Sequence, residues 1–261
     1  MKESYTQLNS QAWDYESQKG NIWTVGCSAE QIQKARNKDM DMVLSPFKKV
    51  PASWIRPFLG KKVLCLASGG GQQAVLLAAG GCMVTEMDIS QRQLDTDLSL
   101  SKENNLKLET IRGDMQDLSC FPDNSFDLIY NPTSSCFISD VQRVYNECAR
   151  VLKDDGYLFT SATNPVLYLF DEKKALKNKI KIKYTLPYSD IQSLTQKQQR
   201  KMIARHDTFE FSHTIDLLIG GLFRAGFILE DFYTDSCGQE IIDSFVGDCY
   251  FACKARKQKK Q

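Results

Sequence analysis

The sequence lacks the cysteine pairs that would indicate a disulfide scaffold or a metal site. Nine cysteines occur in 261 residues, an odd number, and none forms a C-x-x-C pair. A chain of this length does not need disulfides to fold. Cys249 and Cys253 flank a strand-like run, but a zinc site would need two more ligands that we do not find. We therefore expect no metal, and reduced, mostly buried thiols in a cytoplasmic protein.

The sequence also has little excess charge and no long apolar run. The formal net charge is +1, so no overall field favours nucleic acid or an anionic membrane. No apolar stretch reaches the length of a membrane span, and no charged-then-apolar leader precedes the first element. No internal repeat is present. We expect neither nucleic acid nor membrane as a partner, and nothing in the composition indicates an oligomeric state.

Length and composition indicate one large domain, or one domain with an insertion. Hydrophobic residues make up 42% of the chain and charged residues 25%, which suits a globule with a full core. Residues 1–60 precede the first expected strand and are helical or loop-like. Ser28 and Gln31 there have the spacing of a capping box. The aromatic residues of this extension either pack on the core or close over a ligand site as part of a cap: Tyr5, Trp13, Tyr15, Trp23 and Trp54.

The most informative stretch runs over residues 61–90. An apolar run at residues 63–66 is typical of a buried parallel strand, and it ends at Ser68 and three glycines, Gly69 to Gly71. Residues 72–79 then favour a helix, and a second strand ends at Asp88. This order predicts a βαβ half-unit with a ligand crevice at the strand ends. Free amides at the helix start favour an anionic group there, and Asp88 is placed to accept hydrogen bonds from a ribose.

Strands and helices continue to alternate after Asp88, which predicts a mostly parallel Rossmann-like sheet with helices on both faces. Ser90 begins a helix with Leu94 and Leu98 on one face, and Ser139 begins the most periodic helix of the chain. Two final strand runs joined by a polar loop predict an antiparallel hairpin. We therefore divide the chain into a 1–60 extension that forms part of a cap and a 61–261 core.

Residues 165–210 interrupt the alternation and contain a run of lysines. We interpret them as an insertion over the crevice that selects the substrate, with a short added strand at residues 181–184. His213 follows this insertion at the start of a helix that Ser212 caps. A helix start lowers the pKa of a histidine and keeps it neutral, as a general base requires. His213 is thus the candidate base, and a surface or capping role is the alternative.

Five features in order resemble the class I S-adenosylmethionine-dependent methyltransferases, in particular small-molecule enzymes of the ubiquinone and menaquinone type. They are the segments VLCLASGGGQ, VTEMDIS, GDMQDL, FDLIYNP and ECARVLKDDGYLF, and the resemblance covers about residues 61–254. It implies a seven-stranded sheet whose last strand is antiparallel. It also implies S-adenosyl-L-methionine as cofactor and a small-molecule acceptor with an oxygen, nitrogen or carbon nucleophile, methylated by in-line displacement.

The resemblance implies a role for each cofactor-site residue. The loop from Ala67 through Ser68, Gly69 and Gly70 to Gly71 would pass under the methionine part. Asp88 would bind both ribose hydroxyls. Asp114 and the backbone of Met115 would bind adenine, with Ile89 and Met115 on its two faces. Asn131 would lie beside the methyl group. Asp88 as a helix cap, and Asp114 and Asn131 as turn residues, are the structural alternatives.

Two positions depart from the family pattern, and two other functions stay open. The family usually has an acidic residue where Cys65 stands and a glycine where Ala67 stands. Weaker cofactor binding would follow, or a non-catalytic protein that kept the fold. Gly69, Gly71 and Ala74 also match the dinucleotide fingerprint, so the glycine loop alone does not exclude a nicotinamide-dependent oxidoreductase.

Overall fold

The computed structural model describes residues 4–259 and contains one seven-stranded sheet with the order β3-β2-β1-β4-β5-β7-β6. The strands β3, β2, β1, β4 and β5 are mutually parallel, and β7 runs antiparallel to both β5 and β6. This confirms the expected Rossmann-like sheet and its antiparallel end. The strand bounds are β1 Lys62–Leu66, β2 Met83–Asp88, β3 Leu108–Arg112, β4 Phe126–Asn131, β5 Leu152–Thr163, β6 Phe227–Asp235 and β7 Tyr250–Lys257.

Alternating side chains of the parallel strands fill two separate cores, one on each face of the sheet. Val63 and Cys65 of β1 belong to the cluster that includes α4 (Gln73–Ala79). Leu64 and Leu66 belong to the cluster on the opposite face, which includes α6 (Val141–Val151) and α10 (Gly221–Arg224). Helix α5 (Gln91–Glu103) packs beside α4 against β2 and β3. Burial on both faces explains why β1 is a continuous apolar run.

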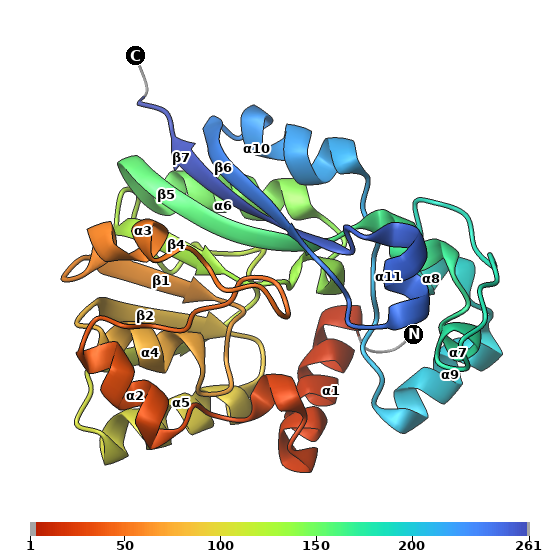
Figure 1. The fold of residues 1–261 in the computed structure, drawn as a ribbon, viewed down its shortest axis with the longest axis horizontal. Helices are drawn as coiled ribbons and strands as arrows, with labels where there is room; N and C mark the ends of the chain where they lie inside the picture. Colours follow the sequence, from red (N-terminus) through yellow and green to blue (C-terminus); the bar gives the residue numbers. More distant parts are fainter. Residues whose placement is uncertain (1–3, 260–261) are drawn as a thin grey trace.

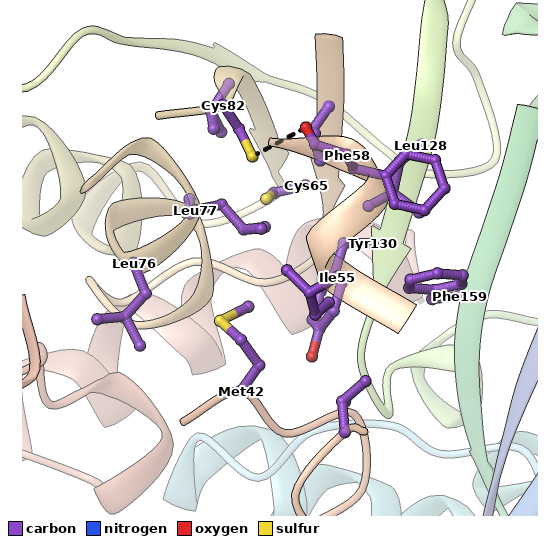
Figure 2. Close-up of a cluster of buried hydrophobic side chains, with 14 of the residues drawn as sticks. Met42, Ile55, Phe58, Cys65, Leu76, Leu77, Cys82, Leu128, Tyr130 and Phe159 are labelled. Carbon is purple, nitrogen blue, oxygen red and sulfur yellow. Dashed lines mark hydrogen bonds between the residues drawn. The ribbon is translucent and has the colours of Figure 1, made fainter. Parts of the chain in front are cut away.

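Figure 2 shows the first of these cores around Cys65. The Cys65 side chain is fully buried among apolar neighbours that include Leu77 of α4 and Leu128 of β4. The thiol of Cys82 donates a hydrogen bond to the carbonyl of Phe58 nearby, at 3.4 Å. All nine cysteines are free and seven of them are buried, as expected. Position 65 therefore faces the packed interior of the sheet and not its ligand edge.

The N-terminal extension packs along the helix layer and over the carboxyl ends of the strands. Helix α1 (Tyr5–Lys19) contacts α5, α2 (Ala29–Arg36) contacts α4, and α3 (Ala52–Ile55) precedes β1. The capping box of Ser28 and Gln31 at the start of α2 is present, as its spacing predicts. Trp54 packs between Phe159 and Tyr233 in the core. In Figure 1 the helix α1 lies beyond the strand ends, next to the helices of the insertion.

Residues 165–210 form α7 (Glu172–Ala175), α8 (Asp190–Ser193) and α9 (Gln196–Arg205) with irregular connections. Figure 1 places these helices together at the carboxyl end of the sheet. The strand predicted at residues 181–184 is reduced to a single bridge between Phe170 and Ile182. Lys181 and Lys183 of this segment are exposed. An isolated segment is not stable as a strand without a neighbouring strand to pair with.

Several local predictions differ from the structure, the helix caps by one or two residues. Asp140, not Ser139, caps α6, and Thr214 rather than Ser212 accepts from the first turn of the helix after the insertion. That helix contains a π-helical segment, Asp216–Gly220. Leu98 of α5 is exposed although Leu94 is buried. The last two strands are joined through a helix, α11 (Glu240–Val246), and not by a simple polar loop.

Candidate functional site

A cavity of about 1090 Å³ opens at the carboxyl ends of β1, β2 and β4. Loops after these strands line one side of it, and residues of α1 and of the insertion line the other. Trp13 and Trp23 of the extension border the cavity, whereas Tyr15 packs on the ring of His206 with the ring centroids 4.2 Å apart. The extension therefore contributes both to the core and to the cavity wall. This volume is at the top of the range of about 300–1,000 Å³ that is usual for small-molecule sites. The cavity therefore has room for two molecules.

The first half of the glycine loop faces this cavity. Ala67, Ser68 and Gly69 line it, and the backbone of Ala67 has a left-handed φ of 50°. A glycine would adopt this φ without strain, so Ala67 carries a cost that the usual family residue avoids. A Cβ on Gly69 would stand 2.8 Å from Cβ of Gln93 and 3.1 Å from a carboxylate oxygen of Asp88. Gly69 is thus required for the close approach of the loop to the acid of β2.

The second half of the loop faces the protein and not the cavity. A Cβ on Gly70 would stand 2.9 Å from Cα of Thr24, and a Cβ on Gly71 3.0 Å from Cα of Gly26. The amide of Cys27 donates to the Gly71 carbonyl at 2.7 Å. Neither Gly70 nor Gly71 lines the cavity. These two glycines, with φ of 108° and 81°, allow the extension to pack directly on the loop.

Asp97 of α5 holds this half of the loop, and the sequence analysis missed it. Its two carboxylate oxygens accept from the amides of Gly70 at 2.9 Å and Gly71 at 3.0 Å, and the side chain is fully buried. Glu86 of β2 lies beside it, also fully buried, with one oxygen that has no partner among the described residues. Burial raises the pKa of Asp97 to about 7 and that of Glu86 well above its usual range. The charges of Asp97 and Asp88 add to the rise in the pKa of Glu86.

This carboxyl pair lies next to the position where the family usually has its own acid. Glu86 and Cys65 are paired in register on neighbouring parallel strands, so their side chains project from the same face of the sheet. The carboxyl group that the family usually has at position 65 of β1 is thus replaced by that of Glu86 on the neighbouring strand β2. Two features of the sequence could have indicated this carboxyl pair. Glu86 is an acid inside the apolar run of β2, and Asp97 lies three residues after Leu94, on the buried face of α5.

Asp88 stands where the sequence places it, at the end of β2 and on the cavity wall. Its oxygens accept from the amides of Gly69 at 3.1 Å and Ser90 at 2.8 Å, so it also shapes the start of α5. Burial raises its pKa, and the backbone hydrogen bonds oppose that rise. A carboxylate can accept about four hydrogen bonds. Two positions therefore remain for hydroxyls that enter from the cavity.

Ile89, Asp114 and Met115 also line the cavity, next to Asp88. The backbone and side-chain amides of Gln116 donate to Asp114, so this carboxylate both closes a turn and faces the cavity. Met115 is buried, and Ile89 is partly exposed. Two apolar side chains and a carboxylate at one end of the cavity suit a flat ring with an exocyclic amino group.

Asn131 and His213 do not reach the cavity. The Asn131 amide donates to the Leu66 carbonyl and to Ser134, and its oxygen accepts from Thr160. The His213 ring is buried, and its Nε2 lies 2.9 Å from the carbonyl oxygen of Ser135. Burial lowers the pKa of His213 and keeps it neutral. Its hydrogen bond and burial are those of a packing residue, which differs both from the base and from the surface or capping role considered for it.

One group of three possible metal-ligating side chains occurs among residues 4–259, outside the cavity. The donor atoms of Cys237, Asp243 and Cys249 lie within 4.8 Å of one another. Asp243 accepts from the Cys237 amide at 2.8 Å and from the Cys249 thiol at 3.3 Å. These hydrogen bonds account for the grouping without an ion. Cys253, which the sequence paired with Cys249, is not part of it. Within the same described range, no helix is long and apolar enough to cross a membrane.

The sequence matches known methyltransferases. Residues 64–160 match the methyltransferase domain family. The Bacillus subtilis protein called uncharacterized methyltransferase YbaJ is 40% identical over 238 residues, which is 91% of this chain and 93% of that protein. The ubiquinone biosynthesis O-methyltransferase of Vibrio atlanticus is 29% identical over 105 residues, 40% of this chain. The chain spans only 44% of that enzyme's length in this second similarity.

Solved structures show the same fold at low sequence identity. The S-adenosylmethionine-dependent methyltransferase of Mesorhizobium loti superposes with a TM-score of 0.60 at 17% identity, over 79% of this chain and 97% of that one. The [4+2]-cyclase SpnF superposes with a TM-score of 0.61 at 16% identity, over 99% of this chain and 98% of that one. The second case shows that this fold also occurs in a protein named for another reaction.

Proposed function

Because the chain belongs to the class I S-adenosylmethionine-dependent methyltransferases, we propose that it methylates a small molecule held in the same cavity as the cofactor. One observation carries this proposal. A single cavity of about 1090 Å³ extends from Asp88 and Asp114 at the strand ends to the side chains of the insertion. Cofactor and acceptor could therefore meet without either leaving the protein. Family membership also sets the nicotinamide alternative aside.

The residues at the strand ends fit the cofactor. Asp88 has two acceptor positions for the ribose hydroxyls, and Asp114 can accept from the adenine amino group. Ile89 and Met115 would lie against the adenine faces, and the Met115 amide would meet a ring nitrogen. The wall from Ala67 to Gly69 would lie under the methionine part. We do not carry Asn131, Gly70 and Gly71 forward as direct contacts, because they do not line the cavity.

The bound cofactor supplies a methyl group on a sulfonium, which is activated for in-line displacement. The protein's part is then alignment and exclusion of water. Trp13 and Trp23 border the cavity from the extension, and Tyr168 and Tyr188 border it from the insertion. We propose that these side chains shield the acceptor and set its approach. His213 is not assigned a catalytic role, since its ring is buried on the Ser135 carbonyl.

Calorimetric titration with S-adenosylhomocysteine and with NAD⁺ tests the cofactor assignment directly. We expect saturable binding of S-adenosylhomocysteine and none of NAD⁺. Transfer of label from S-[methyl-³H]adenosylmethionine to a panel of small amines, phenols, carboxylic acids and thiols then tests the reaction, with protein and RNA as comparison substrates. Label in protein or RNA but in no small molecule would contradict the proposal. Binding without turnover on any acceptor would favour the non-catalytic alternative.

A further inference from the structure

The insertion side of the cavity contains a cluster of aromatic rings and carboxylates whose ligand chemistry has not been assigned. We call it the tyrosine chamber, and define it as Tyr168, Tyr184, Tyr188, Asp190 and Glu210, all of which line the cavity. The rings of Tyr168 and Tyr188 stack with their centroids 5.5 Å apart, and those of Tyr184 and Tyr188 lie 4.7 Å apart. Tyr184, Tyr188 and Asp190 are close together in sequence. Tyr168 lies before them and Glu210 after them, and all five residues line the cavity.

The hydroxyl hydrogens of Tyr168 and Tyr188 are already committed. Tyr168 donates to Glu210 at 2.7 Å, and Tyr188 donates to Asp190 at 2.6 Å. The second oxygen of Asp190 accepts from the Glu210 amide at 2.8 Å. A phenol that donates to a carboxylate offers a ligand only its lone pairs and its ring face. Tyr168 and Tyr188 therefore present acceptors and π-faces to the cavity, and a ligand that contacts them must supply the donors.

The charge near the chamber is negative on the inside. Asp190 is buried and Glu210 partly buried, and one carboxylate oxygen of the neighbouring Asp171 is buried without a partner among the described residues. Burial raises the pKa of Glu210 to about 7, and the charges of Asp190 and Glu172 add to the rise. Carboxylates crowded in this way gain stability from any added positive charge.

The protein's own cations lie at the edge of this group. The ammonium of Lys183 lies 4.6 Å from the centroid of Tyr184 and 3.6 Å from a carboxylate oxygen of Asp171. It shows that an ammonium group is accommodated between a ring and a carboxylate here. Other basic side chains that line the cavity are exposed, and one of them, Arg205, is paired with Asp207.

We propose that the tyrosine chamber binds the positively charged amine or ammonium group of the acceptor, so that the substrate class is a small organic cation. Ring faces attract such a cation, most strongly when water is excluded. An acceptor that binds as a protonated ammonium must lose one N–H proton to become a nucleophilic amine, and the Glu210 carboxylate, which lines the cavity beside the rings, would take that proton while the electron pair remains on nitrogen. This inference rests on the proposed methyltransferase function.

Choline and its neutral isostere 3,3-dimethylbutan-1-ol test the proposal by binding alone. Calorimetric titrations are run with the full-length protein, with and without saturating S-adenosylhomocysteine. We expect choline to bind at least about tenfold more tightly, equivalent to about 1.4 kcal/mol. Equal or weaker binding of choline, or no saturable binding of it, would overturn the proposal.

Matched variants locate the effect in the chamber. Tyr184→Leu should reduce the preference for choline below about threefold, whereas Tyr184→Phe, which keeps the ring, should retain it. Glu210→Gln should reduce it, and Glu230→Gln, which removes a carboxylate paired with Arg256 outside the cavity, should not. Loss of the preference in Glu230→Gln, or its survival in Tyr184→Leu and Glu210→Gln, would contradict the location. Circular dichroism confirms that each variant is folded.

The two levels of inference fail in different ways. If S-adenosylhomocysteine binds but choline shows no preference over its isostere, the chamber proposal is wrong and the proposed function stands. If S-adenosylhomocysteine does not bind, the proposed function is wrong, and the titration without it still decides whether the chamber is a cation site.

Discussion

Replacing Asp97 by alanine should destabilise the protein strongly, although this residue does not line the cavity. Asp97 accepts from the buried amides of Gly70 at 2.9 Å and Gly71 at 3.0 Å. Each buried donor left without a partner costs about 1–3 kcal/mol, so the two amides cost about 2–6 kcal/mol. Relief from burying the carboxylate next to Glu86 offsets part of this. We expect a net loss of about 3 kcal/mol.

The loss is measured as the change in free energy of unfolding by urea, at pH 7. Thermal unfolding should show a decrease in Tm of about 6–12 °C, since 1 kcal/mol corresponds to about 2–4 °C in a domain of this size. Asp95→Ala on the same helix is the control, because Asp95 is exposed and accepts a hydrogen bond from Gln91, one turn away on the same helix. That variant should change stability by less than about 0.5 kcal/mol. A loss below about 1 kcal/mol for Asp97→Ala would refute the role of this carboxylate in holding the loop.

Three further predictions follow from the buried groups. Because folding raises the pKa of Asp97 from 3.8 to about 7, its contribution to stability is complete below about pH 4 and is lost as the pH rises through 7. Urea unfolding at pH 5 and pH 7.5 should therefore show a smaller pH-dependent loss in Asp97→Asn than in the wild type, and an equal loss would contradict the assignment. Cys65→Asp adds a carboxylate beside Glu86 in the packed core and should cost about 3 kcal/mol or more of unfolding free energy, whereas Cys120→Asp on the surface should cost under about 0.5 kcal/mol. His213→Gln can still donate to the Ser135 carbonyl and should keep kcat within about threefold, and a hundredfold loss of kcat at unchanged Tm would restore His213 as a catalytic base.

The mostly parallel sheet and its antiparallel end were predictable because they depend on patterns local to the chain. The apolar run of β1, the glycine turn and the acid that ends β2 each follow from burial on both faces and from turn geometry. The positions of Asp88 and Asp114 on the cavity wall were predictable for the same reason, since they follow the carboxyl ends of parallel strands, and their contacts with a cofactor stay predictions. The cap of α2 at Ser28 was predictable because its hydrogen bonds lie within four residues.

The predicted site residues that do not line the cavity have contacts far away in sequence. Gly70 and Gly71 belong to a glycine pattern that suggests ligand contact, yet they pack on residues 24–27 of the extension. His213 and Asn131 carry polar groups whose partners are backbone carbonyls of other segments, Ser135 and Leu66. Periodicity shows which face of a helix or strand is buried, but it does not show whether a polar side chain there faces a ligand or the protein itself.

The central claim is that one nucleoside-shaped site is held at its sugar by Asp88, and calorimetry with S-adenosylhomocysteine measures it most directly. The account predicts saturable binding to the wild type and at least a tenfold weaker affinity in Asp88→Ala, which is about 1.4 kcal/mol or more. Asp231→Ala, which removes a carboxylate that binds Trp54 away from the cavity, should bind as the wild type does. An affinity of Asp88→Ala within tenfold of the wild type would contradict the ribose assignment, and absence of binding by the wild type would contradict the cofactor site as a whole.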